Sequence, residues 1–179
     1  MPSGLLATVQ APLADADRAA VDWFVRRRRE SLARLAVGLA HLGRGGVLWI
    51  AAGAAAHGFD IGRQRTTLRL ALGVLAAYAG SAGLARLIGR GRPCHGNDIA
   101  LIECPDGPGL PSDQVAGAFA GATALSASVP RLALPLYALA LSIAAARVYA
   151  GVHYPTDVLG GASIGVLAGR AASARAASN

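Results

Sequence analysis

Five uncharged apolar stretches follow one another along the chain from residue 47 onward. Each is rich in Ala, Gly and Leu, and none shows the strict alternation of a β-strand. Each alone is shorter than the roughly 20 residues that cross a bilayer, but flanking arginine side chains that reach the membrane surface would lengthen it. The pattern predicts an all-α fold, an integral membrane bundle of about six helices; the alternative is a soluble helical core. The stretches are residues 47–59, 70–85, 115–129, 132–146 and 158–169.

The N-terminal part is more polar. Residues 15–34 mix acidic side chains and the arginine run 26–29 with scattered apolar positions, a pattern typical of an amphipathic helix at a membrane surface or of a solvated charged helix. Residues 32–42 form a marginal first span. We therefore divide the chain into a cytoplasmic, amphipathic segment at residues 1–30 and a membrane domain at residues 31–176. No stretch near the N-terminus has the pattern of a signal peptide.

Composition narrows the function classes. The chain is 54% apolar and only 15% charged, whereas soluble domains carry about 25% charged residues. All 17 basic residues are arginine, so the chain has no lysine for Schiff-base chemistry or for a phosphate-binding P-loop. Aromatic residues make up 5%, too few for a protein that stacks single-stranded nucleic acid. We therefore expect a membrane partner and no nucleic-acid partner.

Two polar loops, residues 89–114 and 151–157, are separated by two apolar stretches and so face the same side. If residues 32–42 cross the membrane once, most remaining arginines fall on the opposite side. The positive-inside rule makes that side cytoplasmic and both loops extracytoplasmic, in a multi-pass protein of the cell membrane. The arginines assigned to the cytoplasmic side are Arg26, Arg27, Arg28, Arg29, Arg63, Arg65, Arg69, Arg131, Arg170 and Arg175.

Small residues recur at helical spacing. The pairs Gly117–Gly121 and Gly161–Gly165 have the GxxxG spacing that lets helices approach closely in lipid. Such faces also allow a homodimer.

Together the two loops hold the residues with chemical potential. Arginine guanidinium groups bind phosphate oxygens in bidentate fashion, and Ser112 with nearby backbone N–H groups at a helix start makes an anion site. His153 can attack phosphorus, and Asp157 can hold its imidazole in the required tautomer. Alone, His153 could equally be a buried structural histidine. The set is Arg92, Ser112, Gln114, Arg147, His153 and Asp157, with Arg86, Arg90 and His95 nearby.

Three segments resemble the motifs of the type 2 phosphatidic acid phosphatase (PAP2) family. The segment from Arg147 to Asp157, RVYAGVHYPTD, has the R-x5-H-x3-D spacing of the third motif. GRGRP, ending at Pro93, is similar to the end of the first motif, K-x6-RP. LPSDQ, ending at Gln114, is similar to the second motif, PSGH. The motifs occur in the family's order, and the resemblance covers about residues 35–172.

The resemblance implies a metal-free reaction without a cofactor on a lipid phosphate substrate. His153 would form a phosphohistidine, and Asp157 would orient it. Arg92, Arg147, Ser112 and the backbone around Asp113 would hold the phosphate group and its transition-state charge. Ala85 stands where the first motif has its lysine, and Arg86 or Arg90 would supply the missing charge. Asp113 replaces the glycine of PSGH, and we interpret it as an N-cap of the following helix.

Gln114 stands where the family has the histidine that protonates the leaving group. Glutamine is not an acid, and the loss of a general acid costs about 10²–10⁴-fold in rate. Three explanations remain. The substrate could be a polyprenyl diphosphate, undecaprenyl or decaprenyl diphosphate, whose monophosphate is a good leaving group. His95 could act as the acid. Alternatively, the chain is an impaired relative that only binds lipid phosphates. A phosphatidic acid or other lipid monoester phosphatase is the alternative activity.

Cys94 and Cys104 lie together in the first loop. On the extracytoplasmic side they would form a disulfide beside the site, which we favour over two unrelated thiols. With His95 they do not make a convincing zinc site, because no fourth ligand is placed.

Overall fold

The computed structural model describes residues 3–58 and 63–175. Within these ranges, helices are the only regular secondary structure. The predicted all-α class is confirmed, with seven α-helices in these ranges rather than about six, since residues 3–26 form a helix of their own. The elements are α1 (Ser3–Arg26), α2 (Glu30–Leu42), a short 3₁₀ helix η1 (Arg44–Gly46), α3 (Val47–Gly58), α4 (Arg63–Ile88), α5 (Asp113–Ser128), η2 (Pro130–Leu132), α6 (Ala133–Tyr149) and α7 (Pro155–Arg175).

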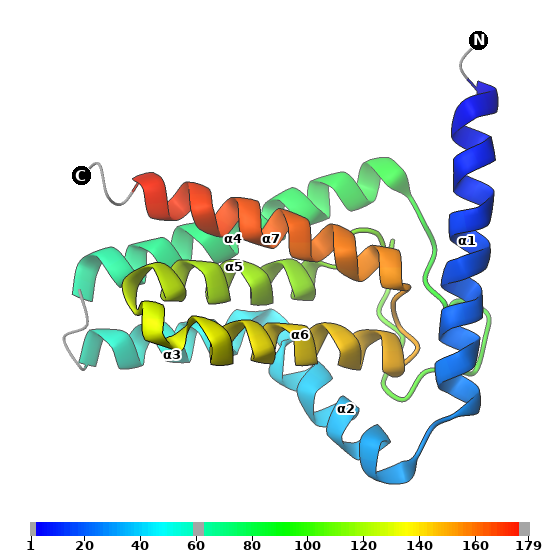
Figure 1. The fold of residues 1–179 in the computed structure, drawn as a ribbon, viewed down its shortest axis with the longest axis horizontal. Coiled ribbons are helices and arrows are strands. Elements are labelled where there is room, and N and C mark those ends of the chain that lie inside the picture. The colour runs from blue at the N-terminus through cyan, green and yellow to red at the C-terminus, as the bar shows by residue number, and fades with distance from the viewer. Residues whose placement is uncertain (1–2, 59–62, 176–179) are drawn as a thin grey trace.

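Helices α3 to α7 run side by side as a bundle, and α1 stands across one end of it (Figure 1). Within residues 3–58 and 63–175, two segments, Arg65–Ile88 and Pro130–Tyr149, are long and apolar enough to cross a membrane. Large apolar side chains are exposed on the outer faces of α4, α6 and α7, as expected where lipid replaces water. The most exposed are Leu75, Leu87, Leu134, Leu141, Leu159 and Leu167.

Residues 30–58 do not form two successive crossings, which corrects the sequence-based expectation for residues 32–42. Helix α2 has 13 residues and is only about 20 Å long, too short to cross the hydrocarbon core alone. After the break at η1, α3 continues in the direction in which α2 runs, away from the end that carries α1. The two helices together therefore make a single crossing of the bundle (Figure 1).

The arginine run 26–29 therefore lies at the same end as the two polar loops, not at the opposite end as we predicted. The chain turns between α1 and α2 within this run, so residues 15–34 are not one continuous helix. The Arg28 guanidinium donates to the carbonyl oxygen of Tyr149 at 3.0 Å, and the Arg29 N–H donates to the Tyr149 hydroxyl at 2.9 Å. A cation at the carboxyl end of α6 is favourable because it meets unpaired carbonyl groups and the helix dipole.

Glycines let the central helix α5 approach its neighbours closely. A Cβ on Gly161 or Gly165 of α7 would lie 2.4 Å from the Ser112 oxygen or 2.3 Å from the Ala116 oxygen. On another face of α5, a Cβ on Gly117 or Gly121 would meet the rings of Tyr78 and Trp49. The predicted close approach is confirmed, and both GxxxG faces are buried within one chain.

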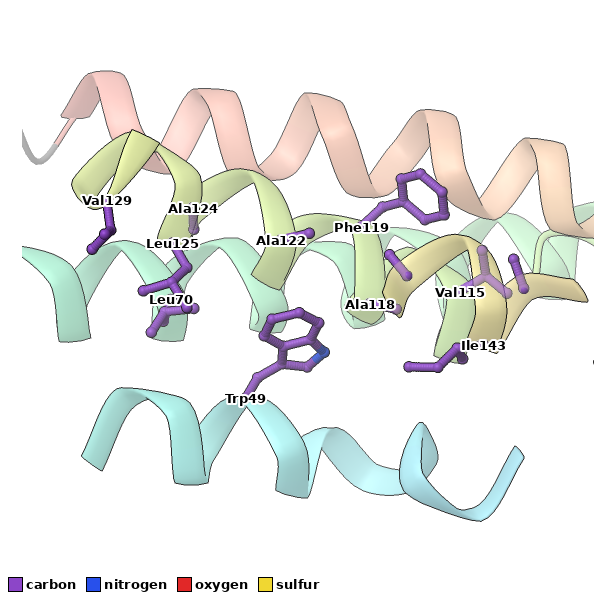
Figure 2. Close-up of a cluster of buried hydrophobic side chains, with 12 residues drawn as sticks. Trp49, Leu70, Val115, Ala118, Phe119, Ala122, Ala124, Leu125, Val129 and Ile143 are labelled. Atoms are coloured by element: carbon purple, nitrogen blue, oxygen red, sulfur yellow. The ribbon is translucent and has the colours of Figure 1, made fainter. Parts of the chain in front are cut away.

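The main core surrounds α5. Figure 2 shows the Trp49 ring rising from α3 toward α5 and Phe119 on the side of α5 that faces α7. Eleven successive residues of α5, from Val115 to Leu125, are buried. Their close packing holds the amino end of α5 rigidly against α7, and that end carries Ser112.

Candidate active site

Two loops meet at the end of the bundle, between α4 and α5 and between α6 and α7. Cys94 and Cys104 form a disulfide within the first loop, with Cα atoms 6.0 Å apart. The Leu101 N–H donates to the Ala150 oxygen at 2.9 Å, which joins the loops. Gly151 has a φ of +77°, and a Cβ there would lie 2.7 Å from the Ile99 oxygen. Only glycine fits this turn, which directs the chain into His153.

His153 is fully buried at the centre of this end. Its Nδ1 faces the Asp157 Oδ2 at 3.5 Å, and its Nε2 lies 2.7 Å from an Arg92 nitrogen and 3.3 Å from the Ser112 hydroxyl. With the proton on Nδ1, the lone pair of Nε2 points toward the arginine and the serine. The structure therefore brings together four of the residues predicted from the sequence.

Asp157 is held from two directions. Its Oδ2 accepts the N–H of Tyr154 at 2.8 Å, which orients the carboxylate in the first turn of α7. Its backbone oxygen accepts the N–H of Ser112 at 3.0 Å. Through this bond and the close glycine contact at Gly161, the amino ends of α5 and α7 form one rigid unit.

The electrostatics keep His153 neutral. Burial lowers the pKa of His153 to about 4, and the nearby Arg147 and Arg92 guanidinium groups lower it as well, while the hydrogen bond to Asp157 opposes the shift. Burial also lowers the pKa of Arg92, and Asp113 and Asp157 act against that change. A neutral imidazole with its proton on Nδ1 keeps Nε2 unprotonated, as a nucleophile requires.

Arg147 lies at the end of α6 with 1% of its surface exposed. Its Nε and Nη1 atoms have no hydrogen-bond partner among the described residues. Arg92, by contrast, donates to the Gly107 and Pro108 oxygens at 3.2 and 3.1 Å. Since unpaired donors are costly to bury, the vacant guanidinium face of Arg147 is a place for an anion.

Other predicted residues lie elsewhere. Arg90 was expected to bind phosphate, but it forms ion pairs with Asp17 at 2.6 Å and with Asp157 at 3.3 Å. Arg86 is exposed near the end of α4. In His95, Nδ1 lies 3.3 Å from the Arg92 N–H and Nε2 lies 3.3 Å from the Pro105 oxygen, so backbone groups occupy both ring nitrogens.

The amino end of α5 also differs in detail from the prediction. Ser112 is the N-cap, and Asp113 is the first helical residue, whose Oδ1 accepts the Gln114 N–H at 2.8 Å. Gln114 is half-buried, and its Oε1 has no hydrogen-bond partner among the residues described.

Sequence reasoning missed Asp17 and Thr156. Asp17 lies on α1 and is 3% exposed, yet it contacts Thr156, which is 139 positions away in the chain. An aspartate among other charged residues of an amphipathic segment carries no signal of such a contact.

Comparisons with known proteins show which proteins the chain resembles. The family model described as the PAP2 superfamily matches residues 66–177. The chain is 32% identical to the decaprenylphosphoryl-5-phosphoribose phosphatase of Mycolicibacterium smegmatis over 125 residues. These residues cover 69% of this chain and 67% of that protein. The crystal structure of Aquifex aeolicus LpxE is similar with a TM-score of 0.74 and 28% identity, over 85% of this chain and 91% of that one. The crystal structure of a transmembrane PAP2 type phosphatidylglycerolphosphate phosphatase from Bacillus subtilis is similar to this structure with a TM-score of 0.78 and 25% identity. The similarity covers 94% of this chain and 88% of that one.

Proposed function

The chain belongs to the PAP2 superfamily, and from that premise we propose that it is a membrane phosphatase that removes the terminal phosphate group from a polyprenyl-linked phosphate. The observation that carries the proposal is the buried, neutral His153 between the Asp157 carboxylate and the Arg92 and Arg147 guanidinium groups. This arrangement suits attack on a phosphorus atom whose oxygens are held by arginine.

The proposed reaction has two steps. In the first, the His153 Nε2 lone pair forms a bond to phosphorus and the bond to the leaving oxygen breaks, while Asp157 stabilises the positive charge that develops on the ring. Arg92, Ser112 and the free donors of Arg147 stabilise the phosphoryl oxygens. In the second, water attacks the phosphohistidine, its proton passes to the solvent, and inorganic phosphate leaves with His153 restored.

Gln114 supports a diphosphate as the substrate. A lipid monophosphate, with a second pKa of about 6 for such a group, leaves without protonation, whereas an alkoxide does not. Gln114 offers only an amide, and the backbone contacts of His95 argue against His95 as a replacement acid. A polyprenyl diphosphate, such as undecaprenyl or decaprenyl diphosphate, therefore fits the site best.

A second candidate is a phosphomonoester on a polyprenylphosphoryl sugar. The observation that favours it is the 32% identity to the decaprenylphosphoryl-5-phosphoribose phosphatase of M. smegmatis. Its leaving group would be a sugar alkoxide, which needs more help from Gln114 than a diphosphate does. Both candidates share a long prenyl tail and a terminal phosphate.

An apolar groove supports a lipid substrate with a long tail. A cavity of about 490 Å³ lies between α2, α6 and α7 and is lined almost entirely by apolar side chains. Its lining includes Val148 and Val158, which adjoin Arg147 and Asp157 in the sequence. We propose that the first isoprene units of the substrate lie in this groove.

We further propose that the site faces the extracytoplasmic side of the cell membrane. The support is the disulfide beside it, because such bonds persist in oxidising compartments. The arginine distribution no longer decides the orientation, since the run 26–29 lies at the same end as the site. Helix α1 crosses that end of the bundle, so in this orientation it would rest on the extracytoplasmic membrane surface and not on the cytoplasmic side that we predicted for residues 1–30 (Figure 1).

A substrate panel tests the proposal. Purified protein in detergent is assayed for phosphate release from farnesyl diphosphate, undecaprenyl diphosphate, a polyprenylphosphoryl phosphoribose and phosphatidic acid. We expect the prenyl diphosphates to be cleaved fastest, and His153→Ala to abolish all release. Gln114→His should raise turnover of the monoesters more than that of the diphosphates. Equal or better turnover of phosphatidic acid by the wild type would refute the polyprenyl assignment.

A further inference from the structure

Asp17 is a buried carboxylate on α1, the helix that stands across the end of the bundle (Figure 1). Its side chain is 3% exposed, whereas Asp15, two residues earlier, is 73% exposed and pairs with Arg18 at the surface. A buried carboxylate is tolerated only where donors satisfy it. The position of its donors shows what Asp17 holds.

The donors to Asp17 come from two segments beside the active site. Its Oδ1 accepts the N–H of Thr156 at 3.1 Å, one of the free N–H groups in the first turn of α7. Its Oδ2 accepts the Thr156 hydroxyl and an Arg90 nitrogen, the latter at 2.6 Å. Asp17 thus caps α7 from another helix and joins α7 to the loop that follows α4.

Arg90 extends this contact to the acid that faces His153. Its Nη1 donates to the Thr156 hydroxyl at 2.5 Å and to the Asp157 Oδ1 at 3.3 Å. Its guanidinium also lies 4.4 Å from the centre of the Tyr154 ring. Arg90 therefore contacts Tyr154, Thr156 and Asp157, all within four residues of His153.

From these contacts we propose that Asp17 is a positioning residue for the Asp157–His153 pair. It acts through Arg90, which contacts both Asp17 and Asp157, and Asp17 itself has no hydrogen bond to His153 among the described residues. Asp17 holds Arg90 between two carboxylates, its own and that of Asp157. Arg90 therefore contacts only the Oδ1 of Asp157, and the Oδ2 of Asp157 remains beside the Nδ1 of His153. Helix α1 is thereby part of the catalytic end of the molecule.

The alternative positions for Arg90 explain why its restraint matters. Without Asp17, the guanidinium can close on Asp157 from 3.3 Å to a shorter, bidentate pair. That pair would draw Asp157 away from the Nδ1 of His153 and reduce the charge that stabilises the imidazolium. The other charged groups that face His153, Arg92 and Arg147, are cations and would not compensate.

The test compares Asp17→Asn, Arg90→Gln, their double variant and Asp15→Asn as the matched control. The proposal rests on the phosphatase activity, so each variant is measured relative to the wild type on whichever panel substrate the wild type cleaves. A wrong assignment of the substrate can then be distinguished from a wrong assignment of the role of Asp17. The measurements are kcat, KM and the thermal midpoint in the same detergent.

We expect Asp17→Asn to lower kcat by about 10–100-fold with KM within about twofold, because a misplaced catalytic group costs rate rather than binding. Asp15→Asn should match the wild type. The double variant should be no slower than the slower single variant, because Asp17 acts through Arg90. A kcat for Asp17→Asn equal to that of Asp15→Asn, multiplicative losses in the double variant, or a loss explained wholly by a lower thermal midpoint would overturn the proposal.

Discussion

Replacing Gly161 by alanine tests whether the close contact between α5 and α7 sets the catalytic geometry. The added Cβ would lie 2.4 Å from the Ser112 oxygen and 3.3 Å from the Ala116 nitrogen, both backbone atoms. Backbone within two packed helices has no rotamer with which to move aside. The helices must therefore separate at the point where Ser112 meets Asp157.

The size of the separation follows from the contact. Ordinary Cβ contacts begin at 3.4 Å, so an atom now at 2.4 Å must move by 1.0 Å. That displacement is enough to disrupt the 3.0 Å hydrogen bond from Ser112 to Asp157 and the 3.3 Å contact from Ser112 to His153. Misplacement of a catalytic group by about 1 Å costs roughly 100-fold in rate, and overpacking costs about 1–3 kcal/mol in stability.

The assay is phosphate release by purified Gly161→Ala in detergent, with the thermal midpoint measured in parallel. Gly165→Ala, with a Cβ 2.3 Å from the Ala116 oxygen one turn further from the site, controls for the packing cost. Gly83→Ala, which would meet nothing within 4 Å, controls for the substitution itself. We expect Gly161→Ala to be destabilised like Gly165→Ala but to lose more activity. A Gly161→Ala rate within threefold of the wild type would refute the reasoning.

Three further predictions follow from the site and its surroundings. Because the pKa of His153 is lowered to about 4, the nucleophile stays neutral as the pH falls, and kcat/KM should remain near its maximum at pH 5.5. The ionisation of the substrate phosphate, measured by ³¹P NMR, is corrected for. A fall in kcat/KM with a midpoint at pH 6.5, where an ordinary histidine titrates, would contradict this prediction. Ala145→Phe, which places a ring in the apolar groove, should raise KM for undecaprenyl diphosphate more than for farnesyl diphosphate, whereas Ala138→Phe on an exposed part of α6 outside the groove should leave both unchanged; equal effects of the two variants would exclude the groove as the tail site. Replacing Cys94 and Cys104 by serine should cost about 2–3 kcal/mol in thermal unfolding, from the entropy of the opened loop, and reduction with alkylation of the wild type should add two labels; labelling without prior reduction would show that the bridge is absent.

The amino-acid pattern was enough to predict the fold class and several of the residues that lie together at the candidate site. Apolar stretches with so few charges have to be buried in protein or lipid, and their composition favours helices. The R-x5-H-x3-D segment resembles a PAP2 motif, and that resemblance implied that Arg147, His153 and Asp157 act together. In the structure, a helix end, a tight turn and a helix start bring the three residues to the same end of the bundle. The GxxxG pairs predicted close helix contacts for a local reason as well: a missing side chain permits approach wherever a neighbour is available.

The tertiary structure decided what depends on partners distant in the chain. Hydropathy shows how many apolar residues a segment has, but it does not show whether two short helices each make a crossing or share one. For this reason the run 26–29 was assigned to the wrong end of the bundle. Arg90 resembled a phosphate ligand because charge alone was visible; its actual partners, Asp17 and Asp157, lie 73 and 67 positions away. A guanidinium binds a carboxylate or a phosphate with the same geometry, so only the positions of the neighbouring groups determine which of the two it holds.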